Sequence, residues 1–238
     1  MKDLVQARKK EMSYHEQFYR DTALFEPGTW LSKPVEVVLD MLSRLDLNNE
    51  VRVLDLGCGV GRNSIPIAQK IQKTGGSVVS MDLLPIAIDK LRTYAEKYKV
   101  NESIHTKVAD AEFYPITPGH FDYIIACSCL EHVSGIAAFR SVIQRMINGT
   151  RNEGIHCILM STEVMEYQIE TGEETEGEIE LNLKTEEAVS TLRELYTDWE
   201  ILIQRAVPQT IHEKKYEKEI EFRSTWLTFA ARNARKRF

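Results

Sequence analysis

A glycine-rich turn directly after an apolar segment is the feature that most limits what this chain can fold into. Residues 51–56 are mainly apolar, as in a buried strand, and Gly57, Gly59 and Gly61 follow at a spacing of two. Glycines here let the backbone turn sharply and approach a ligand, while the next helix points its N-terminal N–H groups at the same spot. We therefore expect a nucleotide-type site at the carboxyl end of a central strand.

The spacing of the glycines also narrows the kind of nucleotide. The dinucleotide fingerprint G-x-G-x-x-G would need glycine at Arg62 if it began at Gly57, and at Ser64 if it began at Gly59. A nicotinamide-dependent oxidoreductase is therefore disfavoured. Asp55, two residues before the first glycine, suits a ligand with a cationic group or hydroxyls. A tight strand–helix turn without a ligand is the alternative interpretation.

Strand-like and helix-like segments alternate along the chain, a pattern that predicts a parallel sheet covered by helices. The expected strands are residues 51–56, 77–82, 104–109, 122–127 and 154–160, followed by closing strands at 199–207 and 225–231. The expected helices lie at about 32–45, from 64, from 85, at 136–147 and at 185–196, and the charged segment 211–221 should form a hairpin or a long loop. We expect one α/β domain over residues 1–238, with a helical extension at 1–33 that is a candidate lid and an acidic insertion at 163–184.

Two more acidic residues come at the ends of the second and third expected strands. Asp82 lies twenty-one residues after Gly61, where a carboxylate can accept both hydrogen bonds from a ribose diol. Asp110 ends the third strand, where it can accept a hydrogen bond from an exocyclic amine such as that of adenine. Each acid could instead be a helix cap or a turn residue. Together with Asp55, they place acids at three successive strand ends, which predicts a nucleoside site.

The glycine turn, Asp82, Asp110 and the segment 121–127 together resemble the ordered motifs of class I S-adenosylmethionine-dependent methyltransferases. The resemblance implies a Rossmann-like, doubly wound, seven-stranded sheet that is mostly parallel with an antiparallel last strand. It also implies S-adenosyl-L-methionine as cofactor, S-adenosyl-L-homocysteine as product, and methyl transfer to a small molecule by in-line displacement. The glycine turn and the acid before it would hold the methionine portion, Asp82 the ribose, and Asp110 with its neighbour the adenine. The full set of expected cofactor contacts is Asp55, Gly57, Cys58, Gly59, Gly61, Arg62, Asn63, Asp82, Leu83, Asp110, Ala111 and Cys127.

A narrower resemblance is to the tellurite-resistance methyltransferase family. Residues 57–64 are similar to that family in having Arg-Asn-Ser after the glycines, and residues 184–199 and 226–232 are similar to its last helix and last strand. That family has a His-Arg pair that is implicated in its active site. His212 matches the histidine, but Glu213 stands where the arginine would be. This departure argues against an oxyanion substrate.

The residues expected nearest the transferred methyl group follow the fourth strand, at Ser128 to His132. Glu131 and His132 are therefore candidate bases or acceptor contacts, and the alternative is a loop in which Glu131 caps or pairs. Tyr14 lies with other aromatic residues at helical spacing, which predicts either a lid residue near the active site or a packed helix face. His212 is a further catalytic candidate, with a surface position as its alternative. For the whole chain, a non-catalytic cofactor-binding interaction or regulatory module is the alternative function.

The charge of the chain is acidic and unevenly distributed. Lys and Arg number 30 against 36 Asp and Glu, which gives a formal net charge of −6 over 238 residues. This balance disfavours a nucleic-acid partner, because such proteins usually carry a basic surface. The acids gather between Glu163 and Glu187, and we interpret this insertion as either a solvated loop or a lid that would repel anionic substrates.

The four cysteines, at positions 58, 127, 129 and 157, include no C-x-x-C pair. This spacing predicts buried, reduced thiols and no metal site. No apolar run approaches the roughly 18 residues of a membrane helix, and the first ten residues lack the apolar core of a signal peptide. We therefore expect a cytoplasmic protein with no membrane partner, and the sequence assigns no oligomeric state.

Overall fold

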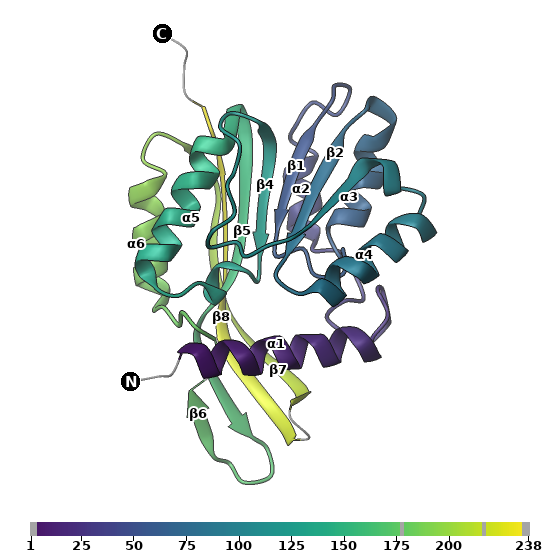
Figure 1. Ribbon diagram of the computed structural model, residues 1–238. Coiled ribbons are helices and arrows are strands. Elements are labelled where there is room, and N and C mark those ends of the chain that lie inside the picture. The colour runs from purple at the N-terminus through teal and green to yellow at the C-terminus, as the bar shows by residue number, and fades with distance from the viewer. Residues whose placement is uncertain (1–3, 177–178, 216–217, 235–238) are drawn as a thin grey trace.

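A computed structural model describes residues 4–176, 179–215 and 218–234 (Figure 1). The strands are β1 Arg52–Leu56, β2 Ser77–Asp82, β3 Ile104–Val108, β4 Phe121–Cys127, β5 Thr150–Gln168, β6 Glu174–Glu176, β7 Glu200–Lys215 and β8 Lys218–Arg232. The α-helices are α1 Leu4–Asp21, α2 Glu36–Leu42, α3 Ser64–Ile71, α4 Pro85–Lys97, α5 Ile136–Gly149 and α6 Thr185–Leu195. Short 3₁₀ turns are η1 Gln72–Thr74, η2 Asn101–Ser103 and η3 Leu130–His132.

The strands form one sheet in the order β3-β2-β1-β4-β5-β8-β7. Strands β1 to β5 pair in parallel, and β8 is antiparallel to both of its neighbours. This confirms the predicted seven-stranded, mostly parallel sheet with an antiparallel last strand. The short β6 is an addition that pairs with β5 off this path. The strand order reverses between β1 and β4, which is the place where open α/β sheets bind their ligands.

Helices cover both faces of the sheet because its strands carry apolar side chains on both sides. Val53 and Leu54 of β1 are fully buried in two different core clusters, as the alternation of side chains along a strand requires. The cluster around Val53 packs against α2, α3 and α4, and the cluster around Leu54 packs against α5 and α6. Among the described residues, no helix is both long enough and apolar enough to cross a membrane.

Three strands continue well beyond the helix-covered part of the sheet. β5, β7 and β8 have 19, 16 and 15 residues, and their outer parts form a ribbon with β6 (Figure 1). We call this part, residues 163–168, 207–215 and 218–225, the outer ribbon. Helix α1 lies across the carboxyl ends of the parallel strands and against the outer ribbon (Figure 1). The strand ends are therefore enclosed from the side of the N-terminal extension.

Several boundaries differ from the sequence-based prediction. The sequence predicts 154–160 for the fifth strand, but β5 covers Thr150–Gln168 because its outer part also pairs with β8. The segment 211–221 is a hairpin rather than a long loop, with residues 216–217 outside the described range. Helix α2 begins at Glu36 rather than near 32, because Val35 is extended and donates its N–H to Asn63 Oδ1 at 3.0 Å.

Candidate functional site

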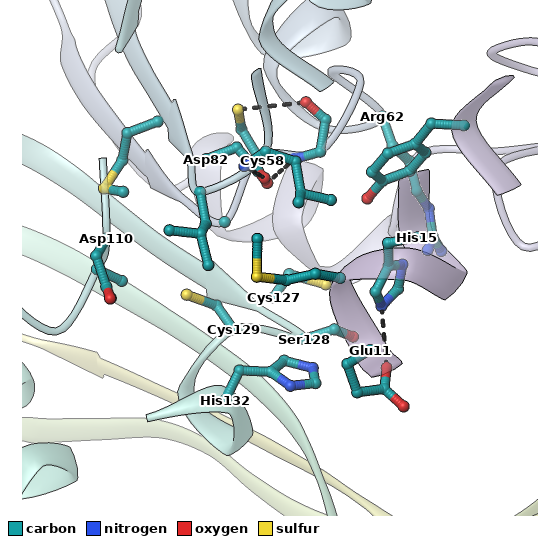
Figure 2. A pocket seen from close by; sticks show the side chains of 18 of the residues that line it. Glu11, His15, Cys58, Arg62, Asp82, Asp110, Cys127, Ser128, Cys129 and His132 are labelled. Atoms are coloured by element: carbon teal, nitrogen blue, oxygen red, sulfur yellow. Dashed lines mark hydrogen bonds and ion pairs between the residues drawn. The ribbon is translucent and has the colours of Figure 1, made fainter. Parts of the chain in front are cut away.

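A cavity of about 160 Å³ lies at the carboxyl ends of β1, β2 and β4, beneath α1 (Figure 2). The structure brings most of the predicted site residues to it: Gly57, Cys58, Gly59, Arg62, Asn63, Asp82, Leu83, Asp110, Ala111, Cys127 and His132 all line the cavity. Asp55, Gly61, Glu131, Tyr14 and His212 lie outside its lining.

The glycine turn approaches the cavity with its backbone. Gly57 and Gly59 have positive φ angles of 68° and 52°, and a Cβ on Gly59 would lie 2.7 Å from the Tyr19 hydroxyl oxygen. Asp82 holds this turn, because its Oδ2 accepts the Gly59 N–H at 2.8 Å and its Oδ1 accepts the Leu84 N–H at 2.9 Å. Burial raises the pKa of Asp82, although these two backbone hydrogen bonds oppose the rise. The turn therefore presents a carboxylate and bare backbone at one point.

Asp55 faces the layer between the sheet and α3 instead of the cavity. Ser64 Oγ donates a hydrogen bond to Asp55 Oδ2 at 2.6 Å, and Ser80 Oγ donates to Ser64 Oγ at 2.9 Å. Burial raises the pKa of Asp55 to about 7, with the Ser64 hydrogen bond acting in the opposite direction. Gly61 is likewise a packing position, since a Cβ there would lie 2.4 Å from Leu91 Cδ1. Asp55 and Gly61 therefore support the glycine turn on its side away from the cavity.

The end of β3 supplies a second carboxylate to the cavity. Asp110 Oδ1 accepts the Glu112 N–H at 2.9 Å, and its Oδ2 accepts a hydrogen bond from Arg8 Nη2 at 2.5 Å. Ala111 lies beside it on the cavity wall, and its carbonyl oxygen accepts a hydrogen bond from Arg145 at 3.1 Å. The ion pair between Arg8 and Asp110 ties α1 to this end of the sheet.

The segment after β4 forms the opposite wall. Ser128 has a positive φ of 49°, and η3 then turns the His132 ring toward α1 (Figure 2). His132 Nδ1 is 2.8 Å from Glu180 Oε2. Burial alone would lower the pKa of His132, but the hydrogen bond to Glu180 and the nearby carboxylates raise it to about 9. Glu131 is buried behind this wall, where its Oε1 accepts the Ser161 N–H at 3.1 Å.

Helix α1 closes the cavity, and buried charges fix its position. Glu11 Oε1 accepts a hydrogen bond from Lys215 Nζ at 2.6 Å, and Lys215 also donates to Glu166 at 2.8 Å. Burial would raise the pKa of Glu11, but contact with His15 and the charge of Lys215 lower it to about 2. Tyr14 points to the outer ribbon and donates its hydroxyl to Glu213 at 2.7 Å. Tyr14 thus anchors α1 to Glu213, the residue that the sequence comparison aligned with the arginine of the tellurite-resistance family.

His212 lies on the outer ribbon, away from the cavity. It is exposed and contacts Glu221, with 2.9 Å between Nε2 and Oε2. Conversely, several cavity residues were missed by the sequence analysis, namely Arg8, Glu11, Trp30 and Glu180. The spacing of Glu11 and His15, one helical turn apart, was the available signal for α1. Glu180 carried no signal, because it is one of many acids in its stretch.

Comparisons with known proteins agree with this architecture. Residues 53–154 match the family model described as a methyltransferase domain. Methyltransferase GfsG of Streptomyces halstedii is 31% identical over 124 residues, which are 50% of this chain and 41% of that protein. TehB from Haemophilus influenzae has a TM-score of 0.65 and 22% identity, covering 92% of this chain and 66% of that chain. A Burkholderia thailandensis 1,6-didemethyltoxoflavin-N1-methyltransferase, solved with its substrate and S-adenosylhomocysteine, has a TM-score of 0.59 and 16% identity over 98% of this chain and 91% of its own.

These comparisons differ in what they establish. The chain spans less than half the length of GfsG, and the two structural likenesses, both under 25% identity, establish the fold alone. The predicted resemblance to class I methyltransferases, and to TehB within them, is confirmed at the level of domain and fold. Residues 53–154 therefore match the methyltransferase-domain family model, and the chain has the fold of the methyltransferases compared above.

Proposed function

We propose that this chain transfers a methyl group from S-adenosyl-L-methionine to a small-molecule acceptor. The observation that carries the proposal is the cavity at the strand-order reversal, where Asp82, Asp110 and the bare backbone of Gly57 and Gly59 meet beneath α1. The matched methyltransferase domain supports the same reaction class.

The residues present fit this cofactor. A carboxylate can accept about four hydrogen bonds, and each Asp82 oxygen uses one for a backbone N–H, so a ribose diol can use the remaining capacity. Asp110 and Ala111 line the cavity, and we propose that they contact the adenine. A Cβ at Gly59 would meet the Tyr19 hydroxyl, so this glycine lets α1 pack closely on the turn, and we propose that the methionine portion lies against the backbone of Gly57 and Gly59. Asp55 would support this turn through Ser64 rather than touch the cofactor.

When bound, the cofactor supplies a methyl group activated by its sulfonium charge. The chain would mainly position an acceptor and keep water out, because effective alignment of two reactants removes much of the barrier. Helix α1 excludes water by covering the strand ends, with Tyr19 and Trp30 lining the cavity from its side. His132 and Cys127 line the wall that follows β4, where we expect the acceptor. Glu131 would position η3 from behind through the Ser161 N–H.

The cavity also bears on the acceptor class. Its limited size and its cover by α1 support a small molecule rather than a macromolecule. Glu11 and Glu180 place two carboxylates near His132, on the acceptor side. Glu11 pairs with Lys215 and Glu180 with His132, so we propose that these carboxylates fix this wall of the cavity rather than select the charge of the acceptor.

We also propose a cytoplasmic location for the chain. The supporting observation is that Cys58, Cys127, Cys129 and Cys157 are all free and largely buried. Reduced cysteines without disulfides are typical of proteins in the cytoplasm.

Calorimetric titration of the purified protein tests the proposal. We expect binding of S-adenosylmethionine and S-adenosylhomocysteine, and no comparable binding of NAD. Release of S-adenosylhomocysteine would then be followed across thiols, phenols, amines and oxyanions. Binding of both cofactor forms without turnover on any acceptor would favour the non-catalytic binding module. Tight NAD binding with no binding of either sulfur compound would refute the assignment.

A further inference from the structure

Three side chains from distant parts of the sequence converge on one wall of the cavity (Figure 2). Glu11 and His15 lie one turn apart on α1, and His132 ends η3. One potential ligand atom of each lies within 4.8 Å of those of the other two. We propose that Glu11, His15 and His132 bind a divalent transition-metal ion of the zinc type.

The separation of the donor atoms suits a shared ion. His15 Nε2 and Glu11 Oε2 are 3.5 Å apart. Two donors on one tetrahedral zinc ion lie roughly 3.4 Å apart, because each bond to the metal is about 2.1 Å long. The spacing of four residues along α1 places both side chains on the same face of the helix. The donor atom of His132 lies within 4.8 Å of these two, so the three side chains would draw closer together on binding the ion.

Neighbouring groups already orient these donors. Metal-bound histidines almost always donate their second N–H to a carboxylate or carbonyl, and His132 Nδ1 lies 2.8 Å from Glu180 Oε2. This contact leaves Nε2 of His132 for an ion. Lys215 occupies Oε1 of Glu11 at 2.6 Å and leaves Oε2 for the same ion. His15 is the exception: its Nε2 faces Glu11, and its Nδ1 is buried without a hydrogen-bond partner among the described residues, so no second group orients this ring.

The charge balance around the site favours a dication. The carboxylates of Glu11, Glu166 and Glu180 are each almost inaccessible to solvent, and Lys215 is the cation that contacts two of them. Arg8 is 3.9 Å from Glu180 but makes its short contact, 2.5 Å, with Asp110. If the charge of Arg8 is assigned to Asp110, three carboxylates remain against the single positive charge of Lys215. The difference is two negative charges. A divalent cation bound by two neutral imidazoles neutralises that excess, in place of the proton with which His132 pairs with Glu180 in the metal-free protein.

The donor set also selects the kind of metal. Two imidazoles and one carboxylate suit zinc, cobalt or iron, whereas magnesium and calcium prefer oxygen ligands alone. An ion held by three protein ligands keeps a coordination position open, as catalytic zinc sites do. Because all three residues line the cavity, that position would be available to an oxygen, nitrogen or sulfur atom of a bound molecule. The cysteine spacing, on which the sequence analysis based its prediction of no metal, carries no information about this set.

Titration of the untagged full-length protein with Co²⁺, followed by visible absorption, tests the site. We expect one Co²⁺ per chain, displaced by Zn²⁺. His15→Ala and His132→Ala should each weaken Co²⁺ binding at least tenfold. Glu180→Gln removes no ligand, and we expect it to weaken binding roughly 10- to 100-fold as the partner of His132. His105→Ala, which removes an exposed imidazole on β3, is the matched control and should bind as the natural protein does.

The outcomes separate this inference from the proposed methyl transfer. His15→Ala leaves the Glu11–Lys215 contact in place, and thermal melting will check that each variant is folded. Absence of bound cobalt in the natural protein, or equal affinities for the natural and His15→Ala proteins, would overturn the metal site. Binding of S-adenosylhomocysteine with a chelator present tests the cofactor site separately. That result together with no cobalt binding would remove the metal site and leave the methyltransferase proposal standing.

Discussion

Replacement of Asp82 by alanine tests the nucleoside site most directly. Its two oxygens accept the N–H groups of Gly59 and Leu84 at 2.8 and 2.9 Å, and the carboxylate faces the cavity. A ribose diol would add two further hydrogen bonds to this charged acceptor. Because each hydrogen bond to a charged group is worth about 1.5–3 kcal/mol, and loss of even one raises the dissociation constant roughly 10- to 150-fold, we expect S-adenosylhomocysteine to bind Asp82→Ala more weakly by at least that factor.

Weaker binding alone does not identify the contact, because the substitution also removes the acceptor of two backbone N–H groups. A comparison with the 2′,3′-dideoxy form of S-adenosylhomocysteine resolves this. The natural protein should bind the dideoxy form more weakly by a comparable factor, whereas Asp82→Ala should bind the two forms about equally. Isothermal titration calorimetry gives all four affinities.

The matched control is Ser64→Ala, which removes a hydrogen bond from the buried Asp55 outside the cavity. This variant should keep the full preference for the ligand that carries the diol. If Asp82→Ala also keeps that full preference, Asp82 does not hold the ribose, and the assignment of the second strand end is wrong.

Three further substitutions test the packing that supports the site, each by urea unfolding. Burial lowers the pKa of His156 to about 3, so the unfolded chain takes up this proton first, and His156 alone should lower the free energy of unfolding by about 2 kcal/mol from pH 7 to pH 5. Asp55 and His132, whose pKa values are raised, change the stability in the opposite direction, so the His156 contribution is measured as the difference between the natural protein and His156→Gln at the two pH values. Lys215→Met leaves two buried carboxylates without their cation and should cost about 3–5 kcal/mol. Gly61→Ala drives a Cβ into Leu91 and should cost about 1–3 kcal/mol, more than Gly28→Ala, where φ is also positive but the space is open. Equal costs for the two glycines would contradict the packing argument.

The parts of the site that could be predicted are those encoded by short stretches of sequence. The turn at residues 57–61 follows an apolar strand, Asp82 ends β2, and Asp110 follows the end of β3 by two residues. In a parallel sheet such strand ends meet at one edge, so the order of elements alone brings these residues together. The order of elements did not predict the antiparallel last strand. That prediction came from the family resemblance.

Asp55 shows where this reasoning stops. Successive side chains of a strand point to opposite faces, and Val53 packs on the α3 side of the sheet. Asp55, two residues later, points to the same side and reaches Ser64 at the start of α3 instead of the cavity. Sequence reasoning placed the residue at the correct strand end, but a position near the end of a strand did not determine the direction of its side chain.

The contacts of α1 could not be predicted, because each joins residues that are remote in sequence. Arg8 meets Asp110, Tyr14 meets Glu213, and Glu11 meets Lys215. The aromatic spacing of α1 indicated a lid or a packed face; in the structure one side of the helix lines the cavity and the other packs on the outer ribbon, and its role as a lid stays a prediction. His15 and Tyr19 line the cavity, while Tyr14 anchors the opposite side of the helix to the outer ribbon.

The acidic stretch after the fifth strand changes meaning when its partners are known. Glu166 and Glu180 are buried, and they contact Lys215 and His132 respectively instead of facing solvent. A buried ion pair adds little stability over an apolar pair of the same size, but removal of one member is costly. Lys215 between Glu11 and Glu166 therefore ties α1 to the outer ribbon in the register that also brings His15 to the cavity. The composition suggests a diffuse negative charge that repels anions. At Glu166 and Glu180, however, the acids form contacts that hold Lys215 and His132 in place beside the cavity.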